Sequence, residues 1–546
     1  MPITKLLERN ADLYGNDVAL VELNPEAKDT RRTTWREYDL IESSSNGGYR
    51  REITWSIFNE KANRFANLLL SRGIKRDDKV GILLMNCLEW LPVYFGILKA
   101  GALAVPLNFR YDSSEIKYCI DLADISVLVF GPEFIGRIES IADDIIDNHL
   151  LFFAGEGNCP SFAEDYTVLT SDFPSTNIDI EINDDDNAAI YFSSGTTGFP
   201  KAILHNHESL MHSCKVEQNH HGQTKDDVFL CIPPLYHTGA KMHWFGSLIS
   251  GGKAVILKGI KPDTILSAVS NEGCTIVWLL VPWASDILEA LDNGTVKLSD
   301  YKLDQWRLMH IGAQPVPKSL IRRWKEYFPN HDYDTNYGLS ESTGPGCVHL
   351  GIENIDKVGA IGIPGYGWEA KIVDSFWNEV KQGDVGELAV KGPGVMTCYY
   401  KNEEATKEIL DDEGWLYTGD MAMQDPDGFI YLVDRKKDVI ISGGENIYPV
   451  QIEDFISAFE PVKDVAVIGL PDARLGEKAT AIISIKDGYT CTKADIDKYC
   501  SSLAKYKRPR EVIFADVPRN PTGKIEKPKL RQIYGAEGLV GKENNS

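Results

Sequence analysis

The sequence predicts an α/β fold with two unequal parts, and three observations support this prediction. Short apolar runs alternate with helical patterns along residues 1–434, which is typical of largely parallel β-sheets flanked by helices. One such run, 188–192, leads into a loop rich in glycine and hydroxyl groups, as strands do at the ligand-binding carboxyl edge of a parallel sheet. After the charged segment 434–438 the pattern changes to α+β, over a length that suits a separate domain.

We therefore expect a large N-terminal domain at 1–434, a hinge at 435–438 and a small, mobile C-terminal domain at 439–546. A chain of 546 residues is too long for one ordinary core and is expected to fold as at least two domains.

Composition excludes several classes of function. The chain has 57 Lys and Arg against 80 Asp and Glu, a net charge of −23, which argues against nucleic-acid partners and requires any anion site to be locally basic. The ten cysteines form no Cys-x-x-Cys pair, so neither a zinc ribbon nor a disulfide framework is indicated. The N-terminus lacks an apolar signal core, and charges and a proline interrupt the apolar window 88–107. We expect no membrane span and a cytoplasmic protein.

The elements can be placed in order along the chain. Asn46-Gly47-Gly48 favours a tight turn, so the similar segments 31–35 and 50–55 on either side are expected to form a β-hairpin. Thr54 can cap the helix that follows, whose apolar positions recur at helical spacing. Strands are then expected at 79–85, 125–130 and 188–192, with a helix at 91–99. In the C-terminal domain we expect helices near 450–459 and 493–503, strands at 465–470 and 479–485, and a loose tail after 533.

The loop at 193–201 has the composition of a polyphosphate site. Its glycines allow close approach of backbone N–H groups, its hydroxyls add donors, and Lys201 adds a mobile positive charge. It is not a Walker A loop, because Phe199-Pro200 precede the lysine and Ala202 follows it.

Five histidines occur close together and suggest a metal cluster at first sight: His205, His207, His212, His220 and His221. No His-Glu-x-x-His pattern or carboxylate spacing accompanies them, so surface or capping roles are expected.

Together with motifs downstream, the loop resembles the signature of the acyl-adenylate-forming superfamily, which includes AMP-forming acyl- and aryl-CoA ligases. The resemblance covers nearly the whole chain. It rests on motifs that stand in the family's order: 337–341 (Tyr-Gly-Leu-Ser-Glu), 386–388 (Gly-Glu-Leu), 417–420 (Tyr-Thr-Gly-Asp), 434–438 (Asp-Arg-Lys-Lys-Asp), 442–449 (Ser-Gly-Gly-Glu-Asn-Ile-Tyr-Pro) and 521–524 (Pro-Thr-Gly-Lys).

The resemblance implies a reaction and its cofactors. A carboxylate attacks the α-phosphate of ATP, pyrophosphate leaves, and the acyl adenylate passes its acyl group to coenzyme A. Mg²⁺ is implied as well, held by Glu341. Catalytic residues implied by the family are Lys524, Thr197, Glu341 and His237.

The resemblance also assigns binding residues. The phosphate loop would consist of Ser193, Ser194, Gly195, Thr196, Thr197, Gly198 and Lys201. The remaining nucleotide and CoA contacts would be Gly312, Ala313, Gln314, Asn336, Tyr337, Gly338, Ser340, Asp420, Leu432, Arg435, Ser442, Gly443, Gly444 and Lys524. In the family the small domain turns about a hinge, here Lys437, so that Lys524 serves adenylation and the segment 442–446 serves thioester formation.

The acid pocket is implied to consist of His237, Gly239, Ala240, His243, Gly312, Gly338 and Pro345. His237 favours an acid without an α-amino group, since amino-acid adenylation domains carry aspartate in this region. Lys241 and His243 argue against a purely apolar tunnel, and we expect them at the pocket rim or bonded to backbone. Trp244, Phe245 and Trp283 could close the pocket early, although Trp283 is more simply a core residue.

Two departures from the family pattern keep the required chemistry: Ala202 replaces a glycine and Ser340 a threonine. The leading hypothesis is a ligase that joins CoA to a compact aryl, alicyclic or short- to medium-chain acid. A ligase that loads a carrier protein and an inactive nucleotide-binding regulator are the alternatives. The sequence leaves open the acid, the direction of flux and whether the chain forms a homodimer.

Overall fold

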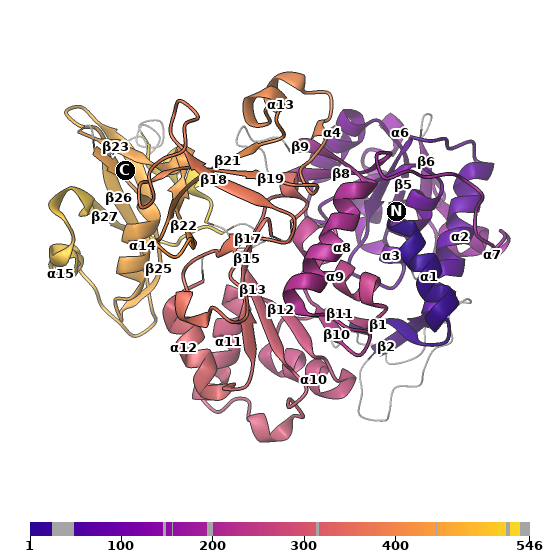
Figure 1. The fold of residues 1–546 in the computed structure, drawn as a ribbon, viewed down its shortest axis with the longest axis horizontal. Helices are drawn as coiled ribbons and strands as arrows, with labels where there is room; N and C mark the ends of the chain where they lie inside the picture. Colours follow the sequence, from indigo (N-terminus) through magenta and orange to yellow (C-terminus); the bar gives the residue numbers. More distant parts are fainter. Residues whose placement is uncertain are drawn as a thin grey trace.

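The computed structural model describes residues 1–24, 49–145, 149–155, 157–193, 200–312, 316–344, 346–443, 445–519 and 525–535. The described residues form an α/β fold with five sheets, as the sequence predicts (Figure 1). Within these ranges no helix is long and apolar enough to cross a membrane.

The first large sheet ends in the candidate phosphate loop. Its strand order is β20-β9-β8-β4-β3-β5-β6-β7, and the strands from β8 to β7 pair in parallel, whereas β9 and β20 run antiparallel to their neighbours. Its strands are β3 (Lys79–Leu83), β4 (Leu103–Pro106), β5 (Ile125–Phe130), β6 (Leu150–Phe153), β7 (Glu164–Asp165), β8 (Asn187–Ser193), β9 (Lys201–Asn206) and β20 (Cys398–Tyr399).

The second large sheet has the order β14-β13-β12-β10-β11-β1-β2 and is parallel except at β2. Its strands are β1 (Val18–Asn24), β2 (Tyr49–Thr54), β10 (Val228–Cys231), β11 (Lys253–Leu257), β12 (Ile276–Leu280), β13 (Leu308–Gly312) and β14 (Asp332–Asp334). The strand expected at 50–55 is therefore β2, but its antiparallel partner in the described residues is β1. The segment expected to be its partner, 31–35, lies outside the described residues.

Helices cover both sheets and fill the space between them. The N-terminal helices are α1 (Thr4–Tyr14), α2 (Trp55–Ser71), α3 (Trp90–Lys99), α4 (Ser113–Ala123), α5 (Ile135–Glu139), α6 (Ala142–Ile145), α7 (Tyr166–Ser171), α8 (His207–His221), α9 (Thr238–Ser250), α10 (Pro262–Glu272), α11 (Val281–Asp292), α12 (Lys318–Tyr327) and α13 (Glu403–Ile409). As expected, Thr54 caps α2, accepting the N–H of Ile57. One core joins residues of α2, α3, α8 and α9 to strands of both sheets, so α8 and α9 are covered on several sides (Figure 1).

Two small sheets connect the large ones to the C-terminal part. One is β15 (Asn336–Tyr337), β16 (Val348–His349) and β17 (Ile363–Pro364); the other is β18 (Glu369–Val373), β19 (Gly386–Lys391), β21 (Leu416–Gln424) and β22 (Ile430–Arg435). All their pairings are antiparallel.

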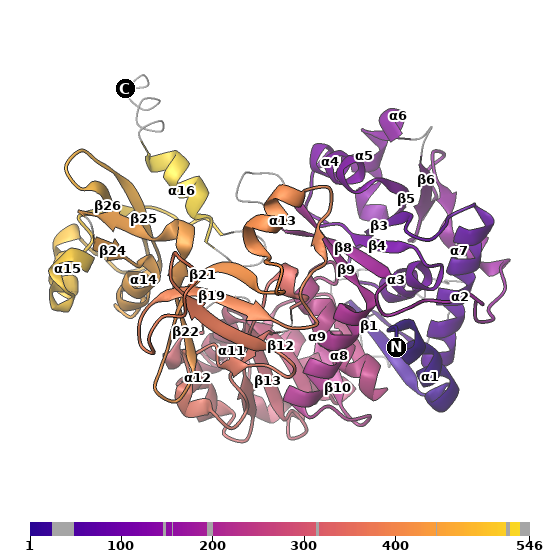
Figure 2. The same ribbon diagram turned by 45° about the horizontal axis from the view of Figure 1, so that its top comes forward.

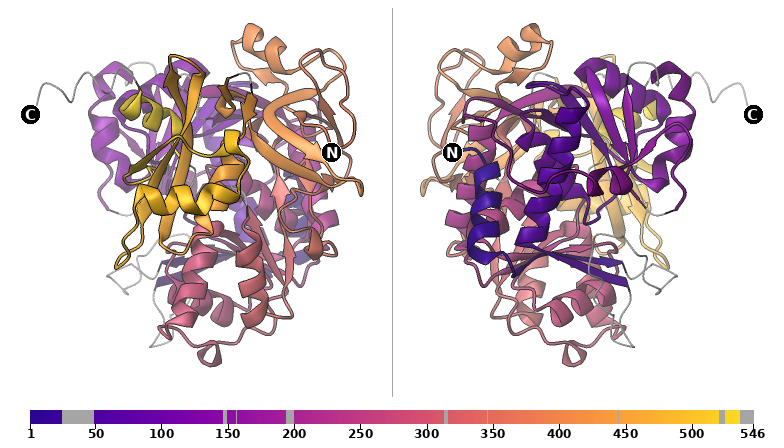
Figure 3. Two further views of the ribbon diagram at one scale, coloured as in Figure 1. Left: turned by 90° about the vertical axis from the view of Figure 1, so that its left-hand side faces the viewer. Right: turned by 90° about the vertical axis from the view of Figure 1, so that its right-hand side faces the viewer.

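The C-terminal part lies at one end of the molecule, beside β21 and β22 (Figures 2 and 3). It contains β23 (Ile440–Ser442), β24 (Glu445–Ile447), β25 (Val462–Asp472), β26 (Gly476–Ile485), β27 (Glu511–Phe514), α14 (Pro449–Ser457), α15 (Lys493–Tyr499) and α16 (Lys527–Tyr534). This arrangement is the α+β pattern that the sequence predicts, with its own apolar cluster.

Candidate active site

Several predicted site residues lie outside the described residues: Ser194, Gly195, Thr196, Thr197, Gly198, Ala313, Gln314, Pro345, Gly444 and Lys524. The two ends of the phosphate loop are described. Ser193 ends β8, Lys201 begins β9, and the two residues face each other across the antiparallel pair. The loop therefore closes a hairpin at the carboxyl end of β8, which is the edge where parallel sheets place their ligands.

Three predicted nucleoside-binding residues meet at one point. The hydroxyl of Tyr337 donates to Asp420 Oδ2 at 2.5 Å, and Arg435 Nε lies 2.6 Å from Asp420 Oδ1. The pairing of β21 with β22 places Asp420 opposite Arg435, so backbone register sets this geometry. Burial and the neighbouring Asp420 carboxylate raise the pKa of Tyr337 well above its ordinary value, so the phenol remains a donor. Leu432 lies on the same strand as Arg435, half-buried.

A second group forms around Glu341, in the short turn Ser340–Ser342. Tyr399 donates its hydroxyl to Glu341 Oε1 at 2.8 Å, and the ammonium of Lys201 lies 4.5 Å from the centre of the Tyr399 ring. Ser340 is held on two sides. Its carbonyl lies 2.7 Å from His205 Nε2, and its hydroxyl lies 3.4 Å from that of Thr238.

Sequence reasoning missed Tyr399, Thr238 and the contact of His205. Tyr399 and Glu341 are 58 residues apart, on segments that no spacing rule connects. The antiparallel pair of β20 with β9 places Tyr399 opposite Ile203, on the strand that begins with Lys201.

The start of α9 carries the predicted acid-binding residues. His237 is the N-cap, and its Nδ1 accepts the backbone N–H of Gly239 at 3.2 Å. A Cβ on Gly239 would lie 2.9 Å from the Trp278 ring, so only glycine fits there. Two further predicted glycines lie on other segments. Gly312 ends β13, and Gly338 follows Tyr337, where a Cβ would lie 3.1 Å from Gly344. Ala240 is buried on α9.

His243 is expected either at the pocket rim or hydrogen-bonded to backbone, and the structure shows the hydrogen bond to backbone. Its Nδ1 lies 2.6 Å from the Gly239 carbonyl, and its ring stacks on Trp278 with centroids 4.4 Å apart. Its Nε2 lies 2.8 Å from His310 Nε2 and 3.3 Å from the Asn336 amide. Burial lowers the pKa of His243. The residue thus connects the start of α9 with β13 and with the strand that carries Tyr337.

The expectation for Lys241 is wrong. This side chain is fully buried, and its ammonium has no hydrogen-bond partner in the part of the chain that the structure describes. It lies 3.8 Å from the centre of the Tyr191 ring and 5.1 Å from that of Tyr94, so aromatic faces replace water around it. Burial lowers its pKa well below the ordinary lysine value.

That Trp244 and Phe245 close the acid pocket remains a prediction. Trp244 packs against Phe58 of α2 and Phe95 of α3, and both Trp244 and Phe245 belong to the central core. Trp283 packs at the edge of the core, as its simpler interpretation predicts.

The surface roles expected for the five neighbouring histidines are wrong too. His205, His207, His212 and His221 are buried, and His220 is half-buried. Because α8 lies between the two sheets, polar residues on more than one of its faces are enclosed (Figure 1). A carboxylate partner does exist for His221, since Glu217 Oε2 lies 3.0 Å from its Nδ1.

The predicted hinge residue Lys437 is exposed in the short turn Lys436–Asp438 between β22 and β23. Arg531 of α16 pairs with Asp438 of the turn at 2.6 Å, and the N–H of Val450, after the turn, donates to Asp434, before it, at 2.9 Å. Just beyond it, Ser442 ends β23 and Gly443 has a φ of +61°, which favours glycine.

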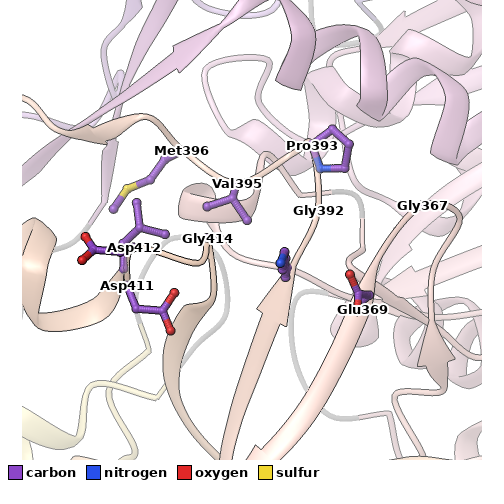
Figure 4. Close-up of a pocket in the computed structure, with 11 residues that line it drawn as sticks. Gly367, Glu369, Gly392, Pro393, Val395, Met396, Asp411, Asp412 and Gly414 are labelled. Atoms are coloured by element: carbon purple, nitrogen blue, oxygen red, sulfur yellow. The ribbon is translucent and has the colours of Figure 1, made fainter.

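A surface cavity of about 530 Å³ lies between β18, β19 and the segments 392–396 and 410–414 (Figure 4). Met396 lines it and donates its N–H to the Glu341 carbonyl at 2.8 Å. None of the predicted site residues that the structure describes lines this cavity.

The fold, with a large N-terminal and a small C-terminal part, and this set of side chains define the class of acyl-adenylate-forming enzymes. The family model of AMP-binding enzymes matches residues 7–400, and that of the AMP-binding enzyme C-terminal domain matches 451–524. The chain belongs to the AMP-binding enzyme family, and within it to the AMP-forming acid–CoA ligases.

Named relatives and solved structures agree with this assignment. A long-chain-fatty-acid–CoA ligase of Mycobacterium tuberculosis is 31% identical over 487 residues, covering 89% of this chain and 93% of the relative. A feruloyl-CoA synthase of an Amycolatopsis species is 32% identical over 490 residues, covering 88% and 94%. The crystal structure of an anthranilate CoA ligase in complex with anthranoyl-AMP matches with a TM-score of 0.84 at 25% identity, covering 99% of this chain and 98% of that one. ATP-bound MatB from Rhodopseudomonas palustris matches with a TM-score of 0.84 at 27% identity, covering 98% and 100%.

Proposed function

We propose that this protein joins a compact carboxylic acid to coenzyme A in two steps. The acid and ATP give an acyl adenylate and pyrophosphate, and the adenylate and CoA then give the acyl-CoA and AMP. The observation that carries the proposal is the adjacency of two groups of side chains, one around Asp420 and one around Glu341. Tyr337 and Glu341 are four residues apart on one segment, so a nucleotide can lie across both groups.

The nucleoside would lie at the first group. Tyr337 offers an aromatic face for adenine, and Asp420 is the acidic residue suited to accept hydrogen bonds from both ribose hydroxyls. Arg435 holds the Asp420 carboxylate in place and offers further donors to the ribose.

The phosphates would lie at the second group. Ser193, Lys201 and Ser340 surround the mouth of the hairpin loop and supply hydroxyl donors and positive charge. Glu341 is suited to Mg²⁺, since only its Oε1 accepts a hydrogen bond within the described ranges, and Mg²⁺ prefers carboxylate oxygen. Bound there, Mg²⁺ would neutralise charge on the phosphate oxygens. Tyr399 fixes the orientation of that carboxylate.

The acid would enter beside the start of α9. His237 Nδ1 accepts a backbone N–H, so a neutral ring carries its proton on Nε2 and can donate to a substrate carboxylate. The compactness of the acid is inferred from the packing behind Gly239, where Trp278 and the stacked His243 fill the space between α9 and β12.

The small domain would serve the two steps in turn. Rotation about Lys437 would first bring Lys524 to the acid carboxylate and the α-phosphate, and then bring Ser442, Gly443 and Gly444 to the pantetheine arm. Exposure of Lys437 and the few bonds across the turn Lys436–Asp438 support this part of the proposal.

A panel of aryl, alicyclic and aliphatic acids, assayed for CoA-dependent AMP release, tests the proposal and identifies the acid. We expect turnover with a compact acid and a fall of several orders of magnitude in adenylation for Lys524→Ala. Near-normal acyl-adenylate formation by Lys524→Ala would contradict the role given to Lys524. Turnover only with long-chain acids would contradict the compact pocket.

A further inference from the structure

A buried group of ionisable side chains lies behind the strand that carries Tyr337. Its members come from α8, β13, β14 and β16, and all are less than 2% exposed. This group, the histidine cluster, consists of Glu217, His221, His310, Asp334 and His349.

Three histidine nitrogens face one carboxylate oxygen of the histidine cluster. Asp334 Oδ2 lies 2.9 Å from His221 Nε2, 3.1 Å from His349 Nδ1 and 3.8 Å from His310 Nδ1. The ligand atoms of His221, Asp334 and His349 all lie within 4.8 Å of one another. The other oxygen, Asp334 Oδ1, accepts the backbone N–H of Gly351 and is held in place by it.

Several polar atoms of the cluster lack a hydrogen bond within the described ranges. They include both oxygens of Glu217 and Nδ1 of His310. The two carboxylate oxygens of Glu217 have ion-pair contacts instead, Oε2 at 3.0 Å from His221 Nδ1 and Oε1 at 3.7 Å from His243 Nε2. Burying a carboxylate without hydrogen bonds costs folding free energy, and buried polar groups that lack a partner often mark a site for an ion or a water.

Charge balance points the same way. The cluster encloses two carboxylates, and a single divalent cation balances both while every imidazole stays neutral. Two imidazole nitrogens and a carboxylate oxygen are a donor set that binds Zn²⁺ and also other first-row divalent ions such as Fe²⁺. Ligands about 2.0–2.1 Å from a tetrahedral ion stand about 3.3 Å apart, close to the two shortest separations from Asp334.

We propose that His221, Asp334 and His349 bind a structural zinc-type divalent cation in the core of the N-terminal part. His310 Nδ1, 3.8 Å from Asp334 Oδ2, lies beside this group of three ligands. Glu217 holds the opposite nitrogen of His221, as carboxylates commonly do behind metal-bound histidines. The ion ties α8 to β14 and β16 and fixes the strand that reaches Tyr337 three residues after Asp334.

A proton on His221, in place of a metal ion, would explain the same contacts. The protonated imidazole of His221 would be a cation between the carboxylates of Glu217 and Asp334. Burial acts to lower the pKa of His221, but these two carboxylates outweigh it and raise the pKa to about 10. The metal content of the protein separates the two occupants.

The test uses full-length protein without a histidine tag, produced in medium supplemented with zinc or with cobalt and purified without chelators. We expect about one metal ion per chain by mass spectrometry and, for the cobalt protein, visible absorption typical of four-coordinate Co²⁺ with nitrogen and oxygen ligands. His349→Gln is expected to lose the metal. The control is His212→Gln, a buried histidine on the same helix that contacts Tyr366 and Trp368, and it should retain the metal.

Two results would overturn the proposal. One is wild-type protein that binds neither zinc nor cobalt near one equivalent, which would leave the proton as the occupant. The other is an equivalent of metal that persists in both His221→Gln and His349→Gln. If His349→Gln fails to fold, the cobalt spectrum of the wild-type protein still tests the proposal. Absorption typical of six-coordinate Co²⁺, or no cobalt absorption, would contradict the proposed site.

Discussion

The substitution Asp420→Asn tests the nucleoside side of the site. Asp420 is 4% exposed, and its two oxygens contact Tyr337 at 2.5 Å and Arg435 at 2.6 Å. Asparagine keeps the volume but removes the charge and one of the two acceptors. Replacing two charge-assisted bonds of about 1.5–3 kcal/mol each by one neutral bond of about 1 kcal/mol costs about 2–5 kcal/mol. That loss corresponds to about a 30- to 4,000-fold fall in kcat/KM for ATP.

The assay is the initial rate of AMP formation against ATP concentration, with acid and CoA saturating. Asp425→Asn is the matched control. Asp425 lies between β21 and β22 of the same hairpin and pairs with Lys357 at 2.9 Å, so its loss should change kcat/KM by no more than about twofold. Thermal unfolding of both variants separates a binding defect from a folding defect. If Asp420→Asn behaves like Asp425→Asn towards ATP, Asp420 does not bind the nucleotide.

Three further substitutions test other parts of the site. Tyr399→Phe frees the Glu341 carboxylate and should raise the Mg²⁺ concentration for half-maximal activity by about tenfold; an unchanged Mg²⁺ dependence would contradict the metal role of Glu341. Gly239→Ala places a Cβ 2.9 Å from Trp278 and should lower kcat/KM for the acid about 10- to 100-fold, with the KM for ATP unchanged; an equal effect on both substrates would remove Gly239 from the acid site. Lys241→Met should stabilise the protein at pH 7. Because the lysine pKa is depressed in the folded state, the free energy of unfolding of the wild type should rise with pH up to about 10.4. The difference in free energy of unfolding between Lys241→Met and the wild type should therefore narrow by up to about 1.4 kcal/mol per pH unit, as measured by urea unfolding at pH 7, 8 and 9. A difference that stays constant with pH would mean that Lys241 is charged in the folded protein.

Local patterns in the sequence predict much of the fold. The apolar run at 125–130 is β5 residue for residue, and Thr54 caps α2 as its position suggests. Hydrophobic period and capping chemistry operate over a few residues, so such features can be read without tertiary structure. The parallel order of the strands follows from their alternation with helices.

Features set by distant pairing could not be predicted in this way. The contact between His221 and Asp334 spans 113 residues and depends on α8 lying against the edge of the second sheet. A histidine-rich helix is usually placed at the surface, whereas here the core elements that pack around α8 enclose these side chains. The aromatic surroundings of Lys241 come from α3 and β8, which no spacing on α9 reveals.

The central claim is that acyl transfer proceeds through an acyl adenylate. The most direct measurement is a single-turnover experiment in which enzyme, ATP and the accepted acid are mixed without CoA, quenched and analysed, and then chased with CoA. We expect enzyme-bound acyl adenylate and pyrophosphate in equal amounts before the chase, and acyl-CoA and AMP in equal amounts after it. ADP and phosphate as the nucleotide products, or acyl-CoA formed with no adenylate beforehand, would contradict the account.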